Sequence, residues 1–328
     1  MVWMDLLGHD AVVERFRRMV QAGRLSSTFL LVGPAGIGKS LFAHRLAQSL
    51  FCQNHAESEL LACGTCPACQ QVVAETHPDL IVIRRPPDRA VIPVELLIGE
   101  REQRMREGMI CQIATRPLLA KRKVAIIDDA DDLNDEGANA LLKTLEEPPP
   151  GSVILLISSS EQRQLPTIRS RSQVIRFQPL GETDLQTLLS RHGVSVDAAR
   201  VAELTRLAFG SFGAALELAD PDAEGFRQQL WSELTRLDRG TSQLASVVNG
   251  YLDGAGKEPS VRRDALARVV QWATMFYRDQ LRQATAPGGS VDPEWVAARI
   301  ERCDEALEQV GANANLATLI ECWLDDLQ

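Results

Sequence analysis

The sequence lacks an excess of positive charge. Of its 328 residues, 35 are Lys or Arg and 44 are Asp or Glu, so the formal net charge is -9. Contacts with phosphates supply most of the affinity of a nucleic-acid-binding protein. The composition therefore argues against a stand-alone DNA- or RNA-binding protein. Any contact with DNA is expected to be local or shared with basic partner proteins.

Long apolar runs are also missing. The first positions carry Asp5, Asp10 and Glu14 instead of a cationic start followed by an apolar core, so we expect no signal peptide. No apolar run approaches the length of a membrane span. We therefore expect a cytoplasmic protein without membrane contact. Its seven cysteines are then reduced thiols or metal ligands rather than disulfides.

A complete phosphate-loop motif follows the apolar run that begins at Phe29. The segment matches G-x-x-x-x-G-K-[ST] and leads into a helical pattern. Its glycines let the backbone aim successive N–H groups into one concavity that a triphosphate can fill, and the next helix adds the positive end of its dipole. A glycine-rich turn that binds nothing is the alternative, but the strand before and the helix after are the context that the motif needs. The sequence predicts that Lys39 reaches the β- and γ-phosphates and that Ser40 ligates Mg²⁺. The predicted nucleotide-binding residues are Gly33, Pro34, Ala35, Gly36, Ile37, Gly38, Lys39 and Ser40.

Two carboxylates end the apolar run that starts at Lys123. Ligands gather at the carboxyl ends of parallel strands, so we expect Asp128 beside the phosphate loop, where it can hold Mg²⁺ through water. Asp129 has the position that often carries the water-orienting carboxylate of NTPases. Aspartate is shorter than glutamate, so the geometry for hydrolysis is expected to be poor. A plain acidic turn stays open as the alternative, because Asp131 and Asp132 follow.

Four cysteines have the spacing of a metal site. Cys52, Cys63, Cys66 and Cys69 supply four soft ligands, enough to close a tetrahedral Zn²⁺ site. A site without an open position is structural. An iron–sulfur cluster is the rival, although nothing else in the sequence indicates redox chemistry. Reduced cysteines without a metal are the third interpretation.

Short apolar runs alternate with helical patterns over the first half of the chain. Such alternation predicts an α/β fold with a parallel sheet covered on both faces. The segment 93–109 is expected to be helical and is highly charged. Beyond Pro179 the strand signal disappears, and stripes of apolar residues at helical spacing predict a helix bundle. We expect one strand that begins at Phe29 and four more over 79–84, 123–128, 153–157 and 174–177. The expected helices of this half include 10–23, 39–50 and 135–147.

Several motifs occur along the chain in a characteristic order. They are the phosphate loop, the four-cysteine insertion, Ile127-Asp128-Asp129-Ala130, the run from Asn139 to Pro149 (NALLKTLEEPP), and Ser170-Arg171-Ser172. Together, these motifs resemble those of the AAA+ subunits of the bacterial DNA polymerase III clamp loader, which are related to replication factor C subunits. The similarity is by motif over the first 220 residues and by length and helical character beyond.

This resemblance implies three domains. They are an ATPase-like AAA+ domain over 1–178 with the zinc insertion at 52–69, a helical lid over 179–221, and a helical collar over 222–328. It implies bound ATP with Mg²⁺ and a ring of five subunits with gamma/tau and delta, which loads the sliding clamp onto primed DNA at the replisome. It also implies that Arg171 is an arginine finger that reaches the ATP of a neighbouring subunit. Without the resemblance, Arg171 is an ordinary surface charge.

Within the family the chain resembles the delta-prime type. Gamma/tau subunits carry an Asp-Glu pair and a lid arginine, whereas this chain has Asp128-Asp129 and Gly213 at those positions. ATP binding is therefore expected, with weak hydrolysis or none. The intact phosphate loop departs from the often degenerate delta-prime loop, and Ser172 replaces the cysteine of the family's Ser-Arg-Cys motif. The alternatives are a gamma/tau-type motor subunit, a stand-alone DNA-dependent ATPase, and a catalytically silent interaction protein stapled by zinc.

Overall fold

The computed structural model describes residues 2–86, 89, 91–103, 106–194, 197–236, 242–286, 291–312 and 314–327. These residues group into two units. The first unit contains the chain up to Gly193 together with Phe209–Gly213, and the second contains Val194–Ala208 and the chain from Ala214 onward. The predicted division into three domains at 178 and 221 stays a prediction.

The apolar runs of the first half form one parallel sheet. Its strand order is β2-β3-β4-β1-β5. In this register Leu31 of β1 lies opposite Ile157 of β4 and Ile175 of β5. The predicted α/β fold is therefore confirmed. The strands are β1 (Thr28–Val32), β2 (Leu80–Ile83), β3 (Lys123–Ile127), β4 (Ser152–Ser158) and β5 (Gln173–Arg176).

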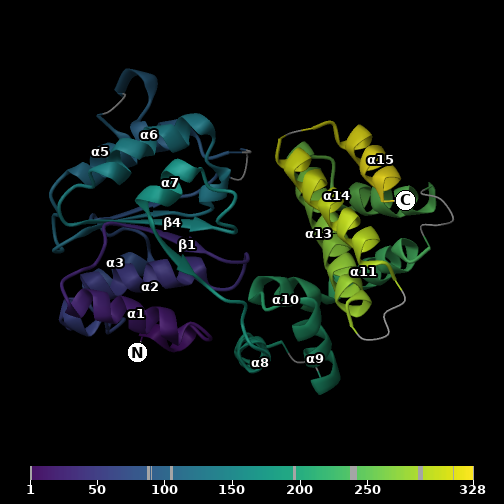
Figure 1. The fold of residues 1–328 in the computed structure, drawn as a ribbon, viewed down its shortest axis with the longest axis horizontal. Coiled ribbons are helices and arrows are strands. Elements are labelled where there is room, and N and C mark those ends of the chain that lie inside the picture. The colour runs from purple at the N-terminus through teal and green to yellow at the C-terminus, as the bar shows by residue number, and fades with distance from the viewer. Residues whose placement is uncertain are drawn as a thin grey trace. The chain divides into compact units, whose positions relative to one another are not determined.

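Helices cover both faces of this sheet (Figure 1). Side chains alternate across a strand, so Phe29 and Leu31 join one buried cluster while Leu30 and Val32 join the other. Helices α1, α2 and α3 lie on the first face, and α5, α6 and α7 lie on the second. The helices before residue 193 are α1 (Asp10–Gln21), α2 (Lys39–Phe51), α3 (Pro67–Val73), α4 (Val94–Ile98), α5 (Gly108–Ala114), α6 (Asp135–Glu146), α7 (Pro166–Arg171) and α8 (Glu182–Arg191), with 3₁₀ turns at η1 (Val2–Asp5), η2 (Glu57–Glu59), η3 (Arg101–Gln103) and η4 (Ala130–Asp132).

The carboxyl ends of three neighbouring strands define the site. Val32 of β1 pairs with Ser158 of β4, and Ile127 of β3 pairs with Leu156 of β4. The residues that follow these strands therefore meet at one edge of the sheet. This edge carries the phosphate loop and the two predicted carboxylates.

The segment 93–109 is not one helix. It begins with α4, continues in η3, and reaches α5 only at Gly108. Gly99 and Gly108 both have φ 85°, and a Cβ atom at Gly108 would lie 2.6 Å from the backbone nitrogen of Gly99. The close approach of two backbone segments in left-handed geometry requires glycine at both positions. These glycines end the helical pattern that the sequence indicated.

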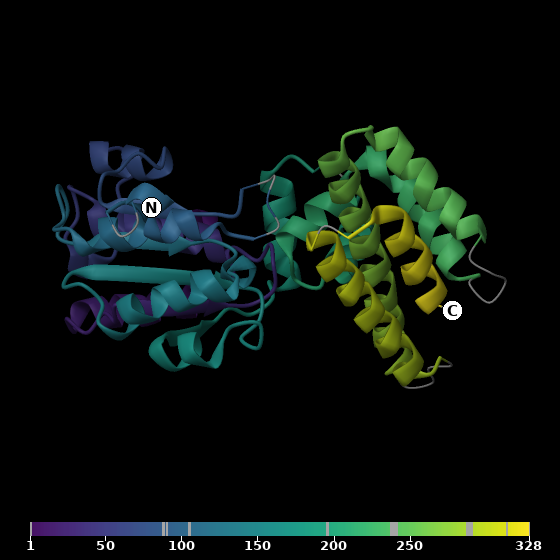
Figure 2. The same ribbon diagram turned by 90° about the horizontal axis from the view of Figure 1, so that it is seen from above.

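The second unit is built from helices, which Figure 2 shows from above. Its buried core includes Trp272, Tyr277 and Leu266 of the long α13, and Trp323 of the last helix. Across the described part of the chain, no helix combines the length and the apolar character that crossing a bilayer requires. The helices from α9 onward are α9 (Ala198–Leu207), α10 (Phe212–Ala219), α11 (Pro221–Leu234), α12 (Ser242–Ala255), α13 (Pro259–Ala284), α14 (Pro293–Gly311) and α15 (Leu316–Asp326).

Candidate nucleotide-binding site and cysteine cluster

The phosphate loop connects β1 to α2 with a glycine-dependent backbone. Gly36 has φ 72° and Gly38 has φ 104°, in the left-handed region that favours glycine. A Cβ atom at Gly33 would lie 2.6 Å from the carbonyl oxygen of Phe177. The loop is therefore a close-packed turn that ends at the N-terminus of α2, as the motif predicts.

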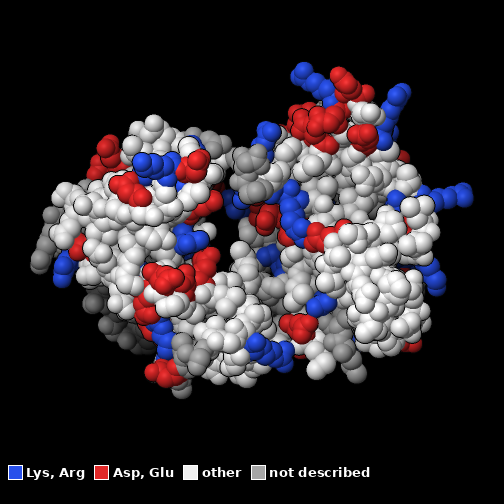
Figure 3. All heavy atoms as spheres, turned by 180° about the vertical axis from the view of Figure 1, so that it is seen from behind, with Lys and Arg blue, Asp and Glu red and all other residues white. Residues whose placement is uncertain are grey.

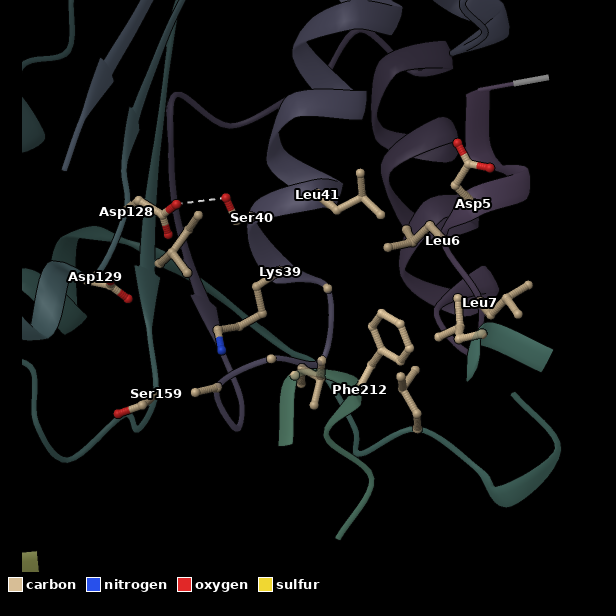
Figure 4. A pocket seen from close by; sticks show the side chains of 18 of the residues that line it. Asp5, Leu6, Leu7, Lys39, Ser40, Leu41, Asp128, Asp129, Ser159 and Phe212 are labelled. Carbon is tan, nitrogen blue, oxygen red and sulfur yellow. Dashed lines mark hydrogen bonds between the residues drawn. The ribbon is translucent and has the colours of Figure 1, made fainter. Parts of the chain in front are cut away.

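Lys39 and Ser40 lie at the start of α2 and face the edge of the sheet. The buried Lys39 donates hydrogen bonds from Nζ to the carbonyl oxygens of Gly33 and Pro34, both at 2.6 Å. Burial lowers the pKa of Lys39, and three nearby aspartates oppose this shift only in part. Ser40 Oγ donates to Asp128 Oδ2 at 2.7 Å (Figure 4). A hydroxyl and a carboxylate from two different elements thus meet where a hard divalent cation would find oxygen ligands.

Asp129 lines the same cavity with an unusual backbone. Its φ is 55°, which is left-handed for a non-glycine residue. Burial, and then the neighbouring charge of Asp128, raise the pKa of the Asp129 carboxyl. The next carboxylate, Asp131, is held in place: it accepts hydrogen bonds from Ser158 Oγ, the Ser159 amide at 2.6 Å and Gln164 Nε2 at 2.8 Å. Asp131 therefore fixes the end of β4 beside the site.

A cavity of about 820 Å³ opens over the phosphate loop. One part of its lining is polar and includes Lys39, Ser40 and Asp128 (Figure 4). Another part is apolar and comes from the residues just after η1, from α8 and the residues just before it, and from the start of α10. Ligand pockets combine mostly apolar walls with a few placed polar groups, and this volume suits a drug-sized molecule. The residues of the apolar part are Leu6, Leu7, Leu180, Leu188 and Phe212, with Arg191 and His192 nearby.

Gly213 contacts the phosphate loop directly. Its N–H donates to the carbonyl oxygen of Gly36 at 3.1 Å. A Cβ atom at Gly36 would lie 2.5 Å from Ser211 Oγ, and one at Gly213 would lie 3.3 Å from Gly36 Cα. Gly213 occupies the position at which gamma/tau subunits are expected to carry a lid arginine. In this chain, that position therefore gives the phosphate loop a backbone contact and no charge.

The four predicted cysteine ligands form one cluster. Their sulfur atoms all lie within 4.8 Å of one another, and Cys63 Sγ lies 3.9 Å from Cys69 Sγ. Zn–S bonds of about 2.3 Å in a tetrahedron place the sulfurs about 3.8 Å apart. Cys52 follows α2, Cys66 and Cys69 lie at the start of α3, and Cys63 comes from the loop between. The donor set and its spacing fit a structural zinc ion.

The thiols of this cluster differ in acidity. Hydrogen bonds from the hydroxyl and amide of Thr65, and from the Cys66 amide, lower the pKa of Cys63 to about 5. Burial raises the pKa of Cys69. A cation held between the sulfurs would stabilise the thiolate form of Cys69 as well.

Arg171 is the last residue of α7 and pairs with α6. Its Nε donates to Glu146 Oε1 at 2.7 Å, Nη2 also contacts that oxygen, and Nη1 donates to the Thr167 carbonyl at 3.0 Å. Among the described residues that line the cavity, none belongs to α7. Arg171 thus does not line the cavity over the phosphate loop, and contacts with α6 and α7 hold its guanidinium.

A family model matches more than half of the chain. Its description is "DNA polymerase III, delta subunit", and the match covers residues 8–181. The chain belongs to this family.

Similar proteins agree with this assignment. The chain is 41% identical to DNA polymerase III subunit delta' of Pseudomonas aeruginosa, over 44% of this chain and 40% of that protein. It is 33% identical to subunit delta' of Escherichia coli, over 71% of this chain and 66% of that protein. It is 26% identical to subunit tau of Escherichia coli, over 83% of this chain and 41% of tau. The matched segments thus span less than two thirds of these relatives' own length.

Sequence reasoning missed several residues of the site in this DNA polymerase III delta-family chain. Ser159 follows β4 at the same edge as the phosphate loop, so the rule that ligands gather at the carboxyl ends of strands could have found it. The apolar lining had no such signal. Leu6, Leu180 and Leu188 have the sequence character of ordinary core residues. Only the folded chain brings the segment after η1, the region of α8 and the start of α10 to one cavity.

Proposed function

We propose that the chain acts as the delta-prime subunit of a DNA polymerase III clamp loader. In this role it assembles with gamma/tau and delta subunits into a five-subunit ring, which uses ATP to load the sliding clamp onto primed DNA at the cytoplasmic replisome. The family match over residues 8–181, together with relatives named delta', carries the proposal. The polymerising chemistry belongs to other subunits of the holoenzyme.

The cavity over the phosphate loop is proposed to bind Mg-ATP. The N–H groups of the loop and Lys39 would hold the phosphates, since Lys39 can exchange its two carbonyl partners for phosphate oxygens. Ser40 and Asp128 would hold Mg²⁺, which neutralises the phosphate charge. The apolar walls formed by the residues after η1, by α8 and by the start of α10 would receive the base.

Hydrolysis by this chain alone is proposed to be slow. Asp129 has a short side chain on a left-handed backbone, and Gly213 places no charge at the phosphate loop. The loss of one group that stabilises transition-state charge costs about 10²–10³ in rate. The chain would therefore bind ATP and turn it over weakly or not at all.

Arg171 is proposed to act on a neighbouring subunit's ATP. A guanidinium in a dry interface stabilises the charge of the transferring phosphoryl group. The pair with Glu146 supports this role, because it keeps the side chain in one orientation before the ring forms. The zinc site is proposed to staple the insertion between α2 and α3 without a catalytic part.

Nucleotide binding and phosphate release together test this proposal. We expect the isolated chain to bind a fluorescent ATP analogue with Mg²⁺, and steady-state phosphate release to be close to background. Lys39→Ala should abolish most of the binding, while the control Lys121→Ala, an exposed lysine outside the cavity lining, should not change it. An unmodified chain that binds no nucleotide would overturn the ATP assignment.

A gamma/tau-type motor is the second candidate. The intact phosphate loop and the Ser40–Asp128 contact favour it, because both belong to a site that can hydrolyse ATP. Steady turnover by the isolated chain at about 1 s⁻¹ or faster, in the range of ordinary enzymes, would support this candidate. The delta-prime proposal predicts a much lower rate.

DNA contact is proposed to occur through the assembled ring. On the face drawn in Figure 3, Lys and Arg side chains alternate with Asp and Glu side chains. A mixed surface on a chain of net charge -9 gives little electrostatic attraction to a phosphate backbone. Basic partner subunits would supply that attraction.

A further inference from the structure

An arginine outside the cavity lies beside the proposed magnesium ligand. Arg84 follows β2 directly, and its Nε is 3.7 Å from Asp128 Oδ2. The Asp128 amide donates to the Ile83 carbonyl at 2.8 Å, so the pairing of β2 with β3 fixes this neighbourhood. Arg84 is not among the described residues that line the cavity. Its positive charge therefore approaches Asp128 from the end of β2, at the same carboxylate oxygen that accepts the Ser40 hydroxyl.

Glu75 holds the same arginine from the other direction. Arg84 Nη1 donates to Glu75 Oε2 at 2.8 Å, and Nη2 contacts Oε1. Glu75 Oε1 also lies 3.0 Å from His44 Nε2, and His44 Nδ1 lies 2.8 Å from the Ser40 carbonyl. The network thus reaches both proposed magnesium ligands, Ser40 and Asp128. Glu75 itself lies two residues beyond the end of α3, the helix that starts at the cysteine cluster.

We propose that Arg84 and Glu75 set the Mg²⁺ affinity of the nucleotide site. Arg84 competes with Mg²⁺ for the Asp128 carboxylate, and the bidentate bond to Glu75 draws the guanidinium away from Asp128. This inference rests on the proposed binding of Mg-ATP. It adds a regulatory charge pair that no phosphate-loop motif contains.

Electrostatics gives the direction of each substitution. Two cations near one carboxylate repel each other, so removing the charge of Arg84 strengthens Mg²⁺ binding. Removing the charge of Glu75 frees Arg84 to pair with Asp128 and weakens Mg²⁺ binding. Arg84 is 46% exposed, so solvent and salt screen the effect to a moderate size. We expect changes of about 3–10-fold.

The test measures the Mg²⁺ concentration that gives half of the Mg²⁺-dependent gain in affinity for a fluorescent ATP analogue. Arg84→Gln should lower this concentration about 3–10-fold, and Glu75→Gln should raise it by a similar factor. Arg84→Lys keeps the charge and should stay within about twofold of the unmodified chain. Affinity for the analogue without Mg²⁺ should change little in all three variants.

Arg122→Gln is the matched control. Arg122 pairs with Glu57 and precedes β3, at the opposite end of the strand from Asp128. Arg122→Gln removes one ion pair of the same unit but changes no contact of Asp128. The Mg²⁺ dependence of analogue binding should therefore stay unchanged. Circular dichroism and zinc content verify that each variant is folded.

Opposite shifts for Arg84→Gln and Glu75→Gln would support the proposal, because mere loss of structure would weaken Mg²⁺ binding in both. Shifts in the same direction, or none, would overturn it while leaving nucleotide binding established. A complete lack of nucleotide binding by the unmodified chain would instead remove the nucleotide site, and this inference with it.

Discussion

Asp79 shows how one buried side chain can organise a distant loop. Its carboxylate accepts the backbone N–H groups of Leu118 at 2.7 Å and of Leu119 and Ala120 at 2.8 Å each. Burial alone would raise the pKa of Asp79, but these three bonds, together with a smaller contribution from His77, outweigh burial and lower the pKa. The turn that leads into β3 is therefore tied to the start of β2 by a single charge.

We predict that Asp79→Asn destabilises the first unit by about 2–4 kcal/mol at neutral pH, because an amide cannot accept all three N–H groups and buried donors are left unpaired. Urea unfolding followed by circular dichroism measures this loss. The folded pKa of Asp79 is depressed, so its stabilisation is present above the unfolded pKa of about 3.9 and disappears as the pH falls through the lower folded pKa.

The difference in free energy of unfolding between the unmodified chain and Asp79→Asn should therefore shrink as the pH is lowered below about 4. A difference that is independent of pH between about 6 and 3 would contradict the role given to the carboxylate charge.

Single residues of the site were predictable to different degrees. The sequence placed Asp128 near Ser40, and the structure joins them by a hydrogen bond of 2.7 Å, because both follow strands of one parallel edge. Their role as Mg²⁺ ligands stays a prediction. Arg84 and Glu75 carried no signal, since a surface ion pair formed by residues of a loop and a strand end has no recognisable spacing.

At the level of elements, the strands and the capped helices were predictable. The strands of the first half are short apolar runs. In the structure, α6 begins after Asn134, whose Oδ1 accepts the Gly137 amide at 2.8 Å and caps the helix. The predicted helix over 135–147 is confirmed as α6 within one residue. The segment 93–109 was expected to be helical, and it contains α4, η3 and the start of α5. It is not one helix, because the backbone turns at Gly99 and Gly108 for tertiary reasons.

The cysteine insertion is the element with the sharpest chemical prediction. We expect one zinc ion per chain, held by Cys52, Cys63, Cys66 and Cys69. Closed thiolate sites contribute on the order of 10 kcal/mol in small zinc peptides. The insertion packs into the buried cluster on one face of the sheet, but the buried cluster on the other face contains no residue of the insertion. Cys69→Ser should therefore lose the zinc and loosen residues 52–73, while most of the α/β fold survives.

Elemental analysis of protein purified without chelator measures the metal, and limited proteolysis locates the loosened segment. Cys111→Ser is the control, since Cys111 lies on α5 outside the cluster. Iron in place of zinc, or no metal at all, would show that the zinc assignment is wrong.

For the whole molecule, the family was predictable from the sequence, whereas the packing of the second half and the domain boundaries were less so. The run from Asn139 to Pro149 and the phosphate loop indicated the clamp-loader family, and the family match confirms it. From its apolar stripes alone, the helical second half was predicted only as a bundle, because stripes on α13, α14 and α15 fit any helix packing. Its division into lid and collar came from the family resemblance. The boundaries of lid and collar stay predictions.

The proposed role of Arg171 is exerted only in the assembled ring. We predict that Arg171→Ala leaves this subunit folded, zinc-loaded and able to enter the ring, and that the assembled complex hydrolyses ATP and loads clamps more slowly. Arginine fingers supplied in trans contribute about 10³–10⁵ in rate in GTPases, and the effect here is smaller because only one of several ATP sites loses its finger.

The measurement is ATP hydrolysis by the reconstituted complex, with Arg169→Ala as the control two residues away on α7. Glu146→Ala should give a weaker form of the same defect, because Arg171 then loses its carboxylate partner. An Arg171→Ala complex that loads clamps at the unmodified rate would make Arg171 an ordinary surface charge.

The central claim is membership of the clamp-loader ring, and assembly tests it most directly. The chain is mixed with the delta and gamma/tau subunits of its own organism, and the mass of the product is determined by native mass spectrometry. We predict one defined five-subunit complex that contains a single copy of this chain. The delta-prime assignment is contradicted if this chain does not bind delta and gamma/tau under conditions in which those subunits bind their other partners.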